Sequence, residues 1–279
     1  MPRTTGSVSP RLPEPFHEVC HEYTKFIIEN TKDLTILSKM ETNFEHSNRE
    51  IPSWVPDLRF PRGTIAEPGC LAKVAFLGDR AMIVEGVILG QCVAVTQPMA
   101  PDSDIELGVL LSRFEAGILH AACEVRQAVF KDVLTSWLET FTNPDGVHPI
   151  NIVTMRAVYG YLLKAERIEL SEIEDDAKQT LVRGELITKI AATLHVHLSL
   201  YSHLLAGDGT VAQLNRPHFL VLPGDTLCLF RGSVDVSLIR PCGSEYEFIG
   251  NCRIRCDTSR EAYDDEYFSR RQVTQFTLI

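Results

Sequence analysis

The sequence predicts an α+β protein in which a helical bundle packs against a small antiparallel β-sheet or a partly closed barrel. The bundle is predicted by apolar residues that recur at three- and four-residue steps from residue 107 to residue 141. The sheet is predicted by short alternating runs within residues 218–256, separated by glycine and proline turns. We expect the two layers to meet at residues 51–57, where two prolines hold the chain extended around Trp54.

Composition limits the domain organisation. The chain has 279 residues, of which 44% are hydrophobic, enough for one sizeable core. We expect a single domain over residues 16–258, preceded by a flexible leader over residues 1–15. Residues 259–279 are expected to form an acidic tail, either as a peripheral helix or as a disordered segment.

Charge and cysteine usage limit the partners and the compartment. A formal net charge of −10 repels phosphate backbones and anionic lipid headgroups, so we expect neither nucleic acid nor membrane partners. The eight cysteines show no CxxC pair and no spacing typical of a disulfide framework. We therefore expect reduced thiols and a cytoplasmic protein.

The domain divides into four predicted elements, which are a helix over residues 16–30, a β-hairpin over residues 71–95, a helical bundle over residues 104–206 and a β-meander over residues 218–256. The apolar stripe of the first helix consists of Phe16, Val19, Tyr23, Phe26 and Ile27. The turn of the hairpin is expected at Gly78-Asp79, and the last helix of the bundle is expected to continue to Leu205.

One pattern in the first helix resembles a metal site. Residues 17–21 match H-E-x-x-H, in which histidines at i and i+4 hold zinc and the glutamate acts as a general base. Here charged Glu22 follows at once, and His17 and His21 lie on the flank of the apolar stripe. A solvated helix N-terminus is the preferred interpretation, so we expect no metal and no cofactor.

The last predicted helix of the bundle carries side chains that can line an interior space. His197 and Tyr201 lie four residues apart and would share a helix face, whereas His195 and His197 would point about 200° apart. Histidine and tyrosine provide hydrogen-bond donors beside apolar walls. The alternative interpretation is that these residues are ordinary core or surface positions.

Five short motifs stand in the order Asp33–Ser38, Ile51–Asp57, Pro223–Asp225, Leu238–Pro241 and Phe248–Gly250. In sequence, order and approximate spacing they resemble the C-terminal region of fungal heterokaryon-incompatibility (HET) proteins. The resemblance covers most of residues 16–256 and does not include the N-terminal HET domain associated with cell-death signalling. It implies a stand-alone module, and short HET-like proteins of this kind resemble norbornene-forming Diels–Alderases of fungal diterpenoid biosynthesis.

The resemblance implies two alternative functions. One is a cofactor-independent cyclase, a pericyclase of Diels–Alder type that acts on a small apolar, terpenoid-like substrate. Such a reaction needs a cavity that orients the reacting groups and a hydrogen-bond donor that polarises a carbonyl, but no nucleophile or metal. The other is a non-enzymatic recognition module of the HET family. A cyclase needs an enclosed apolar pocket, whereas a recognition module needs an exposed apolar patch.

Residue type and helix position nominate six residues for the cyclase site, which are the catalytic donors Tyr159, His197 and Tyr201 and the substrate-binding residues Trp54, Arg156 and His195. Trp54 is expected to form a wall, and Arg156 is expected to clamp a carboxylate of the substrate.

Overall fold

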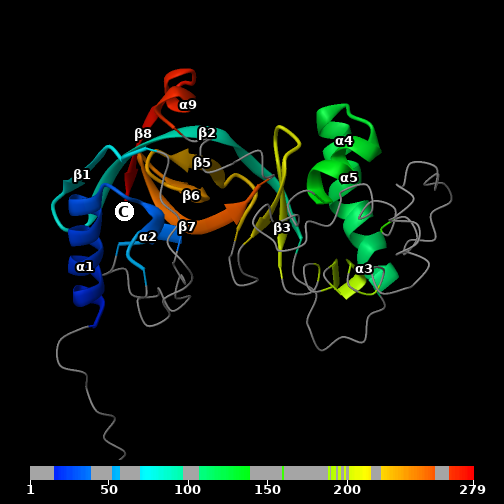
Figure 1. Cartoon of the computed structure of the whole chain (residues 1–279), viewed down its shortest axis with the longest axis horizontal. Coiled ribbons are helices and arrows are strands. Elements are labelled where there is room, and N and C mark those ends of the chain that lie inside the picture. Colours follow the sequence, from blue (N-terminus) through cyan, green and yellow to red (C-terminus); the bar gives the residue numbers. More distant parts are fainter. Residues whose placement is uncertain are drawn as a thin grey trace, which may run out of the picture.

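The computed structural model describes residues 16–38, 52–56, 70–96, 107–138, 201–214, 221–254 and 264–279, together with residues 159, 188, 190–192, 194, 195 and 198 (Figure 1). The predicted leader over residues 1–15, Arg156 and His197 lie outside this part of the chain. In the part that is described, no helix has both the length and the apolarity needed to cross a membrane.

The dominant element is one eight-stranded sheet. Its strands are β1 (Val74–Leu77), β2 (Ala81–Thr96), β3 (His203–Ala206), β4 (Val211–Leu214), β5 (Thr226–Phe230), β6 (Val236–Cys242), β7 (Glu245–Arg253) and β8 (Thr274–Leu278). All strand pairs are antiparallel except β7 with β8, which meet in parallel at Tyr246 and Leu278.

The long strand β2 holds the sheet together. Its first half pairs with β1 and β8, its centre pairs with β5, and its last residues pair with β3. Irregularities in the register after Ile88 and after Cys92 bend the strand, so that it passes from one neighbour to the next. Gly86 permits the close approach of β5, because a Cβ atom there would lie 2.7 Å from the carbonyl oxygen of Leu229. The hydrogen-bonded order β2–β3–β4–β7–β6–β5 then returns to β2 and closes a circuit.

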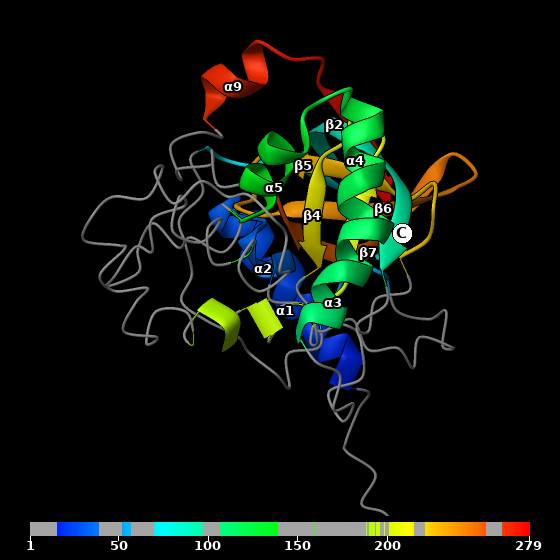
Figure 2. The ribbon, with the colours of Figure 1, turned by 90° about the vertical axis from the view of Figure 1, so that its right-hand side faces the viewer.

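Helices flank the sheet on two sides. The helices α1 (Phe16–Thr31) and α2 (Thr35–Ser38) lie beside β1, at the left of Figure 1. On the other side α3 (Leu107–Phe114), a π-helical turn (Glu115–Leu119) and α4 (His120–Arg126) form one continuous rod, which Figure 2 shows in front of β4. The rod ends at Gln127, whose φ of 51° is left-handed, and α5 (Phe130–Leu138) follows.

The predicted fold class is wrong in its proportions. We expected a helical bundle packed with a small sheet, whereas the described residues form mostly sheet, with helices on its flanks. The predicted single long helical pattern after residue 107 is also interrupted, by the π-helical turn that contains Gly117 and by the left-handed Gln127.

The third helix of the predicted bundle does not extend to Leu205. Residues His203–Ala206 form β3, and Tyr201 precedes this strand outside any helix. Every residue of β3 and β4 is buried, so these strands have no exposed face and no alternation of buried with exposed positions. A short run that is buried on both faces has no periodicity that separates a strand from a buried helix.

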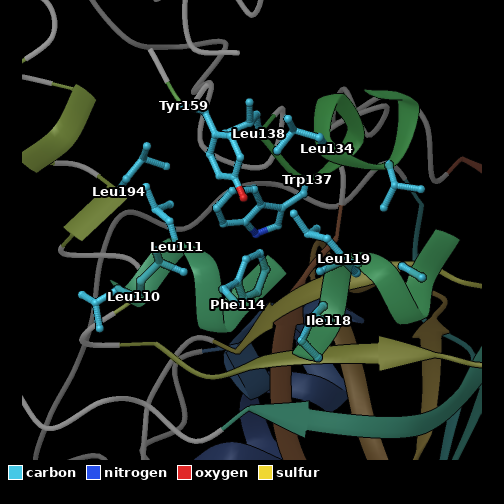
Figure 3. Close-up of a cluster of buried hydrophobic side chains, with 14 of the residues drawn as sticks. Leu110, Leu111, Phe114, Ile118, Leu119, Leu134, Trp137, Leu138, Tyr159 and Leu194 are labelled. Carbon is cyan, nitrogen blue, oxygen red and sulfur yellow. The ribbon is translucent and has the colours of Figure 1, made fainter. Parts of the chain in front are cut away.

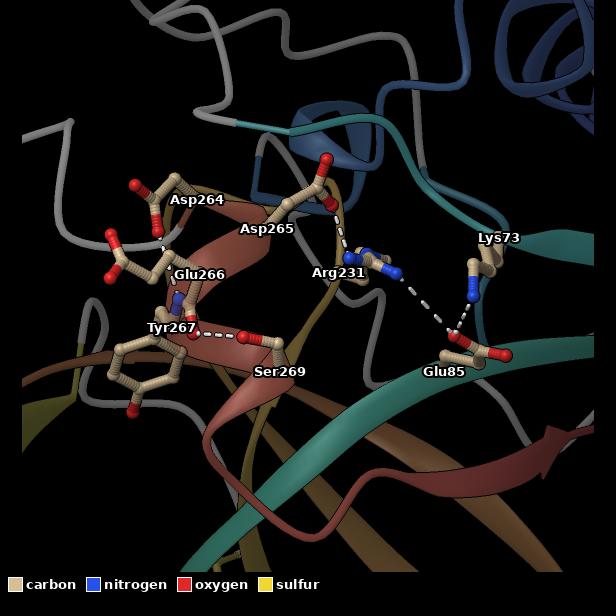
Figure 4. Close-up of polar contacts among 8 residues, drawn as sticks. All are labelled: Lys73, Glu85, Arg231, Asp264, Asp265, Glu266, Tyr267 and Ser269. Carbon is tan, nitrogen blue, oxygen red and sulfur yellow. Dashed lines mark hydrogen bonds and ion pairs between the residues drawn. The ribbon is translucent and has the colours of Figure 1, made fainter.

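The last residues join the sheet instead of forming only a tail. The helix α9 (Asp265–Ser269) begins at Asp264, whose carboxylate accepts a hydrogen bond from the amide of Tyr267 at 2.9 Å. Strand β8 then pairs with β2, and Phe276 and Leu278 are fully buried. Arg231 fixes α9 to the sheet, because it contacts both Asp265 and Glu85 (Figure 4).

The buried apolar side chains of the described residues form three clusters. One fills the interior of the strand circuit and includes Leu204, Leu227 and Leu238. A second lies between α1, α2 and the β1 end of the sheet, and Trp54 is at its centre. The third lies between the α3–α5 helices and strands β3 and β4.

Candidate functional site

Helix α1 buries a face that differs from its apolar stripe. Cys20, Thr24 and Ile28 are at most 2% exposed and face the core around Trp54. The hydroxyl of Thr24 is satisfied because it donates to the carbonyl of Cys20 at 2.7 Å.

Three residues of the apolar stripe of α1 face outward, whereas Phe16 and Ile27 are partly buried. Val19, Tyr23 and Phe26 are 58%, 50% and 59% exposed. Val19 and Tyr23 each precede a buried residue by one position, which is about 100° around the helix. Three large apolar side chains in successive turns form a continuous exposed row, unlike the single exposed apolar residues that are common on protein surfaces.

This outer face of α1 is held rigidly. The helix ends at Lys32, whose φ is 53° and whose amide donates to the carbonyl of Ile28 at 2.9 Å. The carbonyl of Lys32 then accepts a hydrogen bond from the amide of Ala72 at 2.7 Å. Both ends of this contact are backbone, so the exposed row is presented in one orientation.

A row of carboxylates lies beside the apolar row. Glu18, Glu22 and Glu29 are all exposed on α1. The one lysine within the helix, Lys25, turns away from them, because its ammonium group lies 3.6 Å from the carboxylate of Asp79 and 5.5 Å from the ring centre of Phe76. The outer face of α1 is consequently apolar on one side and acidic on the other.

A second candidate is the aromatic cluster between the helices and β3. The indole of Trp137 contacts Phe114, Tyr159 and His203, with ring centres 4.4, 6.0 and 6.0 Å away. The Tyr159 side chain is 1% exposed, and its hydroxyl has no hydrogen-bond partner among the described residues. Figure 3 shows this hydroxyl directed toward Trp137.

The phenol of Tyr159 stays protonated over the physiological range. Burial, and secondarily the charge of Glu115, raises the pKa of Tyr159 far above its ordinary value. The group therefore stays a neutral phenol, which can donate a hydrogen bond to an acceptor such as a carbonyl oxygen and can also accept one.

Of the four predicted site residues that the structure describes, Trp54 and Tyr159 lie in two different parts of the core. Trp54 is buried in the core beside α1, where its indole nitrogen donates to the carbonyl of Arg80 at 3.3 Å. Tyr159 belongs to the separate helical core. His195 and Tyr201 are partly exposed, and His197 and Arg156 lie outside the described residues.

The motifs that carry the HET resemblance make structural contacts. Asp225 is 2% exposed and receives two hydrogen bonds from the guanidinium of Arg240, at 2.8 and 2.9 Å, which joins the Pro223–Asp225 and Leu238–Pro241 motifs. The hydroxyl of Ser53 accepts from the amide of Phe248 at 2.8 Å and donates to the last carbonyl of the chain.

The first motif is held in the same manner. Asp33 caps α2 by accepting from the amide of Thr35 at 2.7 Å. The side-chain amide of Asn251 donates to the carbonyl of Leu37 at 2.8 Å. These polar residues position α2 and the strands. The motifs therefore indicate a fold and do not identify a catalytic site.

Near α9 the surface is hollowed. An open hollow of about 500 Å³ is lined by Asp264, Glu266, Tyr267, Arg270 and Arg271. Its walls are charged, and Arg271 lies over the ring of Tyr267 with 4.3 Å between the guanidinium carbon and the ring centre. This is not the enclosed apolar pocket that a cyclase needs.

No metal site is formed by the described residues, since they contain no group of three potential ligands. Of the H-E-x-x-H pattern, the ring of His21 packs 5.3 Å from that of Trp54, and its Nδ1 atom lies 3.3 Å from the carboxylate of Glu22. The side chain of His17 lies outside the described part of the chain.

Comparisons with known proteins give no match. No family model matches this chain, and neither a curated protein nor a solved structure does. The function is therefore inferred from the geometry alone.

The sequence pattern identified the apolar stripe of α1 but did not show that a different face of the helix is buried. The signal that distinguishes the two faces is the spacing of Cys20, Thr24 and Ile28, which are small or β-branched residues at i, i+4 and i+8. A helix face built of such residues allows close packing, although it is less hydrophobic than the face beside it.

Proposed function

We propose that this chain is a non-enzymatic recognition module of the HET type that docks a partner protein on the outer face of α1. The observation that carries the proposal is the exposed row of Val19, Tyr23 and Phe26 on a helix whose other side is fixed in the core. Exposed apolar rows with polar borders are typical of protein interaction sites. An exposed apolar patch is what a recognition module needs, whereas a cyclase needs an enclosed apolar pocket.

A photo-crosslinking experiment tests this proposal. Benzoylphenylalanine replaces Tyr23 in one full-length protein and Val129 in another, because Val129 is an exposed apolar residue far along the chain, between α4 and α5. We expect a defined crosslinked partner from position 23 and none from position 129, and a second substitution, Phe26→Ser, should abolish it. Equal crosslinking from both positions, or an unchanged product with Phe26→Ser, contradicts docking at α1.

A cofactor-independent cyclase is the second candidate, and Tyr159 is the observation that favours it. A buried, protonated phenol among aromatic rings can donate a hydrogen bond to a carbonyl conjugated to a dienophile. In the cycloaddition two σ bonds form as two π bonds are consumed, and no proton or electron leaves the substrate. The product is an isomer of the substrate, with identical mass.

Mass spectrometry tests the cyclase directly. Purified protein is incubated with extracts of a fungal host that lacks it, and a compound that disappears is matched to an isomer that forms. Formation of the isomer by the wild-type protein but not by Tyr159→Phe supports the cyclase. Equal turnover by the two proteins removes Tyr159 from the mechanism.

We place the protein in the cytoplasm, with its thiols reduced. Among the described residues no two cysteines form a disulfide, and Cys92, Cys228 and Cys252 are buried in or beside the strand circuit. Buried reduced thiols of this kind are typical of proteins kept in a reducing compartment.

A further inference from the structure

We infer that the partner docked by α1 is a basic amphipathic helix. This inference rests on the proposed function and specifies the chemistry of the partner. It follows from the arrangement of the apolar row, Val19, Tyr23 and Phe26, relative to the three exposed glutamates of the same helix.

The apolar row has the spacing of a coiled-coil seam. Val19, Tyr23 and Phe26 are separated by four and then three residues, and Phe16, partly buried, precedes them by three. These are successive a and d positions of a heptad repeat, the spacing at which a second helix packs along the first. From Phe16 to Phe26 the seam is about 15 Å long at a rise of ~1.5 Å per residue, which is nearly three turns of a partner helix.

Acidic side chains occupy one flank of this seam. In the same heptad, Glu22 and Glu29 both fall at g positions, and both are exposed. On the other flank, Cys20 and Ile27 occupy the e positions and face or border the core of this protein. Among the described side chains of α1, a partner helix therefore meets charge along the g flank only, and that charge is negative. Residues at e and g select the partner by charge, so the partner needs lysine or arginine along that edge.

Charge also disfavours three other occupants of the seam, which are an antiparallel copy of α1, an anionic membrane and a nucleic acid. In a two-fold dimer that pairs α1 with an antiparallel copy of itself, the g-position glutamates of the two copies would face each other. Lys25 cannot compensate, because its ammonium group is directed to Asp79. An anionic membrane or a nucleic acid is repelled by the same glutamates and by the net charge of −10.

Binding of two synthetic helical peptides to the full chain tests the inference. Both peptides carry leucine at every a and d position; one has lysine along the flanks and the other has glutamate at the same places. We expect the lysine peptide to bind at least about tenfold more tightly at low salt, with the difference shrinking as the salt concentration rises to about 0.5 M. The variant Phe26→Ser should weaken binding of the lysine peptide about tenfold, whereas Val129→Ser should leave it unchanged.

Two charge-reversed proteins with the same net charge distinguish the effect of charge beside the seam from the effect of the net charge of the protein. Glu22→Lys with Glu29→Lys changes the flank of the seam, whereas Glu124→Lys with Asp132→Lys changes exposed acids on α4 and α5. We expect the first pair to reverse the preference toward the glutamate peptide and the second pair to leave the preference in place. All four positions are exposed, and circular dichroism confirms that the variants are folded.

The outcomes separate the partner class from the proposed function. If both charge-reversed proteins lose the preference equally, the lysine peptide recognises overall charge and the inference is overturned. If the two peptides bind equally tightly and both respond to Phe26→Ser, α1 is a docking site but its partner is not basic. If neither peptide binds, or if the wild-type chain forms a dimer that Phe26→Ser disrupts, a basic helix is not the occupant, and crosslinking from position 23 decides whether α1 docks another protein.

Discussion

The change Arg240→Met should lower the free energy of unfolding by about 3 kcal/mol. Arg240 donates two hydrogen bonds to Asp225, which is 2% exposed, and the substitution leaves that carboxylate buried without its counter-charge. Breaking a buried pair from one side costs roughly 3–5 kcal/mol. The lower end applies here, because the Arg240 side chain is 28% exposed and the amide of Leu222 still donates to Asp225 at 2.8 Å.

Urea denaturation followed by tryptophan fluorescence measures this change, and two further variants make it specific. Adding Asp225→Asn to Arg240→Met removes the unpaired charge but keeps an acceptor for Leu222, so the double variant should be more stable than the single one by about 1–2 kcal/mol. The exposed pair of Arg270 with Glu266 is the control, and Arg270→Met should cost less than about 0.5 kcal/mol. A loss below about 1 kcal/mol for Arg240→Met, or no recovery in the double variant, refutes the assignment of this pair as a structural bond.

Three further predictions concern the two sides of α1, the buried phenol and the buried thiols. Ile28→Ala should cost about 2–4 kcal/mol, whereas Phe26→Ala should change the free energy of unfolding by less than about 0.5 kcal/mol; equal losses in urea titrations would mean that both faces of α1 are packed. Tyr159→Phe should be neutral or stabilising by up to about 1 kcal/mol, because it removes a buried hydroxyl, and a clear loss in the same assay would reveal a partner for that hydroxyl. Burial raises the pKa of the Cys92 thiol to about 11, so its contribution to stability is complete below the ordinary thiol pKa and is lost as the pH rises through about 11. Between about pH 9 and 11, Cys92→Ala should therefore make the decline of stability with pH shallower than in the wild-type protein; an unchanged slope would contradict this linkage.

Local sequence patterns were sufficient to predict strands where glycine turns occur next to alternating apolar and polar residues. The turn after β1 contains Gly78 at φ 64°, and the turns before β5 and between β6 and β7 contain Gly224 at φ 97° and Gly243 at φ 68°. Left-handed positions of this kind favour glycine, so the glycines of the sequence mark the ends of these strands. The hairpin of β1 with β2 and the succession of β5, β6 and β7 follow from these signals.

Long-range pairing was not predictable in the same way. Strand β8 pairs with β2 across almost two hundred residues, and β3 pairs with the far end of β2. Strand β3 shows no two-residue period, because it is buried on both faces, and β8 alternates over only five residues, in which Phe276 and Leu278 are the buried positions. Both segments become strands because they pair with β2, which is distant in the sequence. Their own residues do not indicate this pairing.

Residues that stabilise the fold and residues on an exposed surface differ in what their substitution can show about function. Polar residues of the HET-like motifs, such as Asp225 and Ser53, and Asn251, which bonds to the first motif, join the strands to one another and to α2. Substituting them lowers stability, and any activity of the protein then falls with the folded fraction, so such variants cannot identify a functional surface. The exposed face of α1 has the opposite property, because Tyr23 and Phe26 contribute little to the core and are accessible to a partner. A loss of binding on substituting Phe26, with the free energy of unfolding unchanged, therefore assigns function to α1 in a way that no substitution in the motifs can.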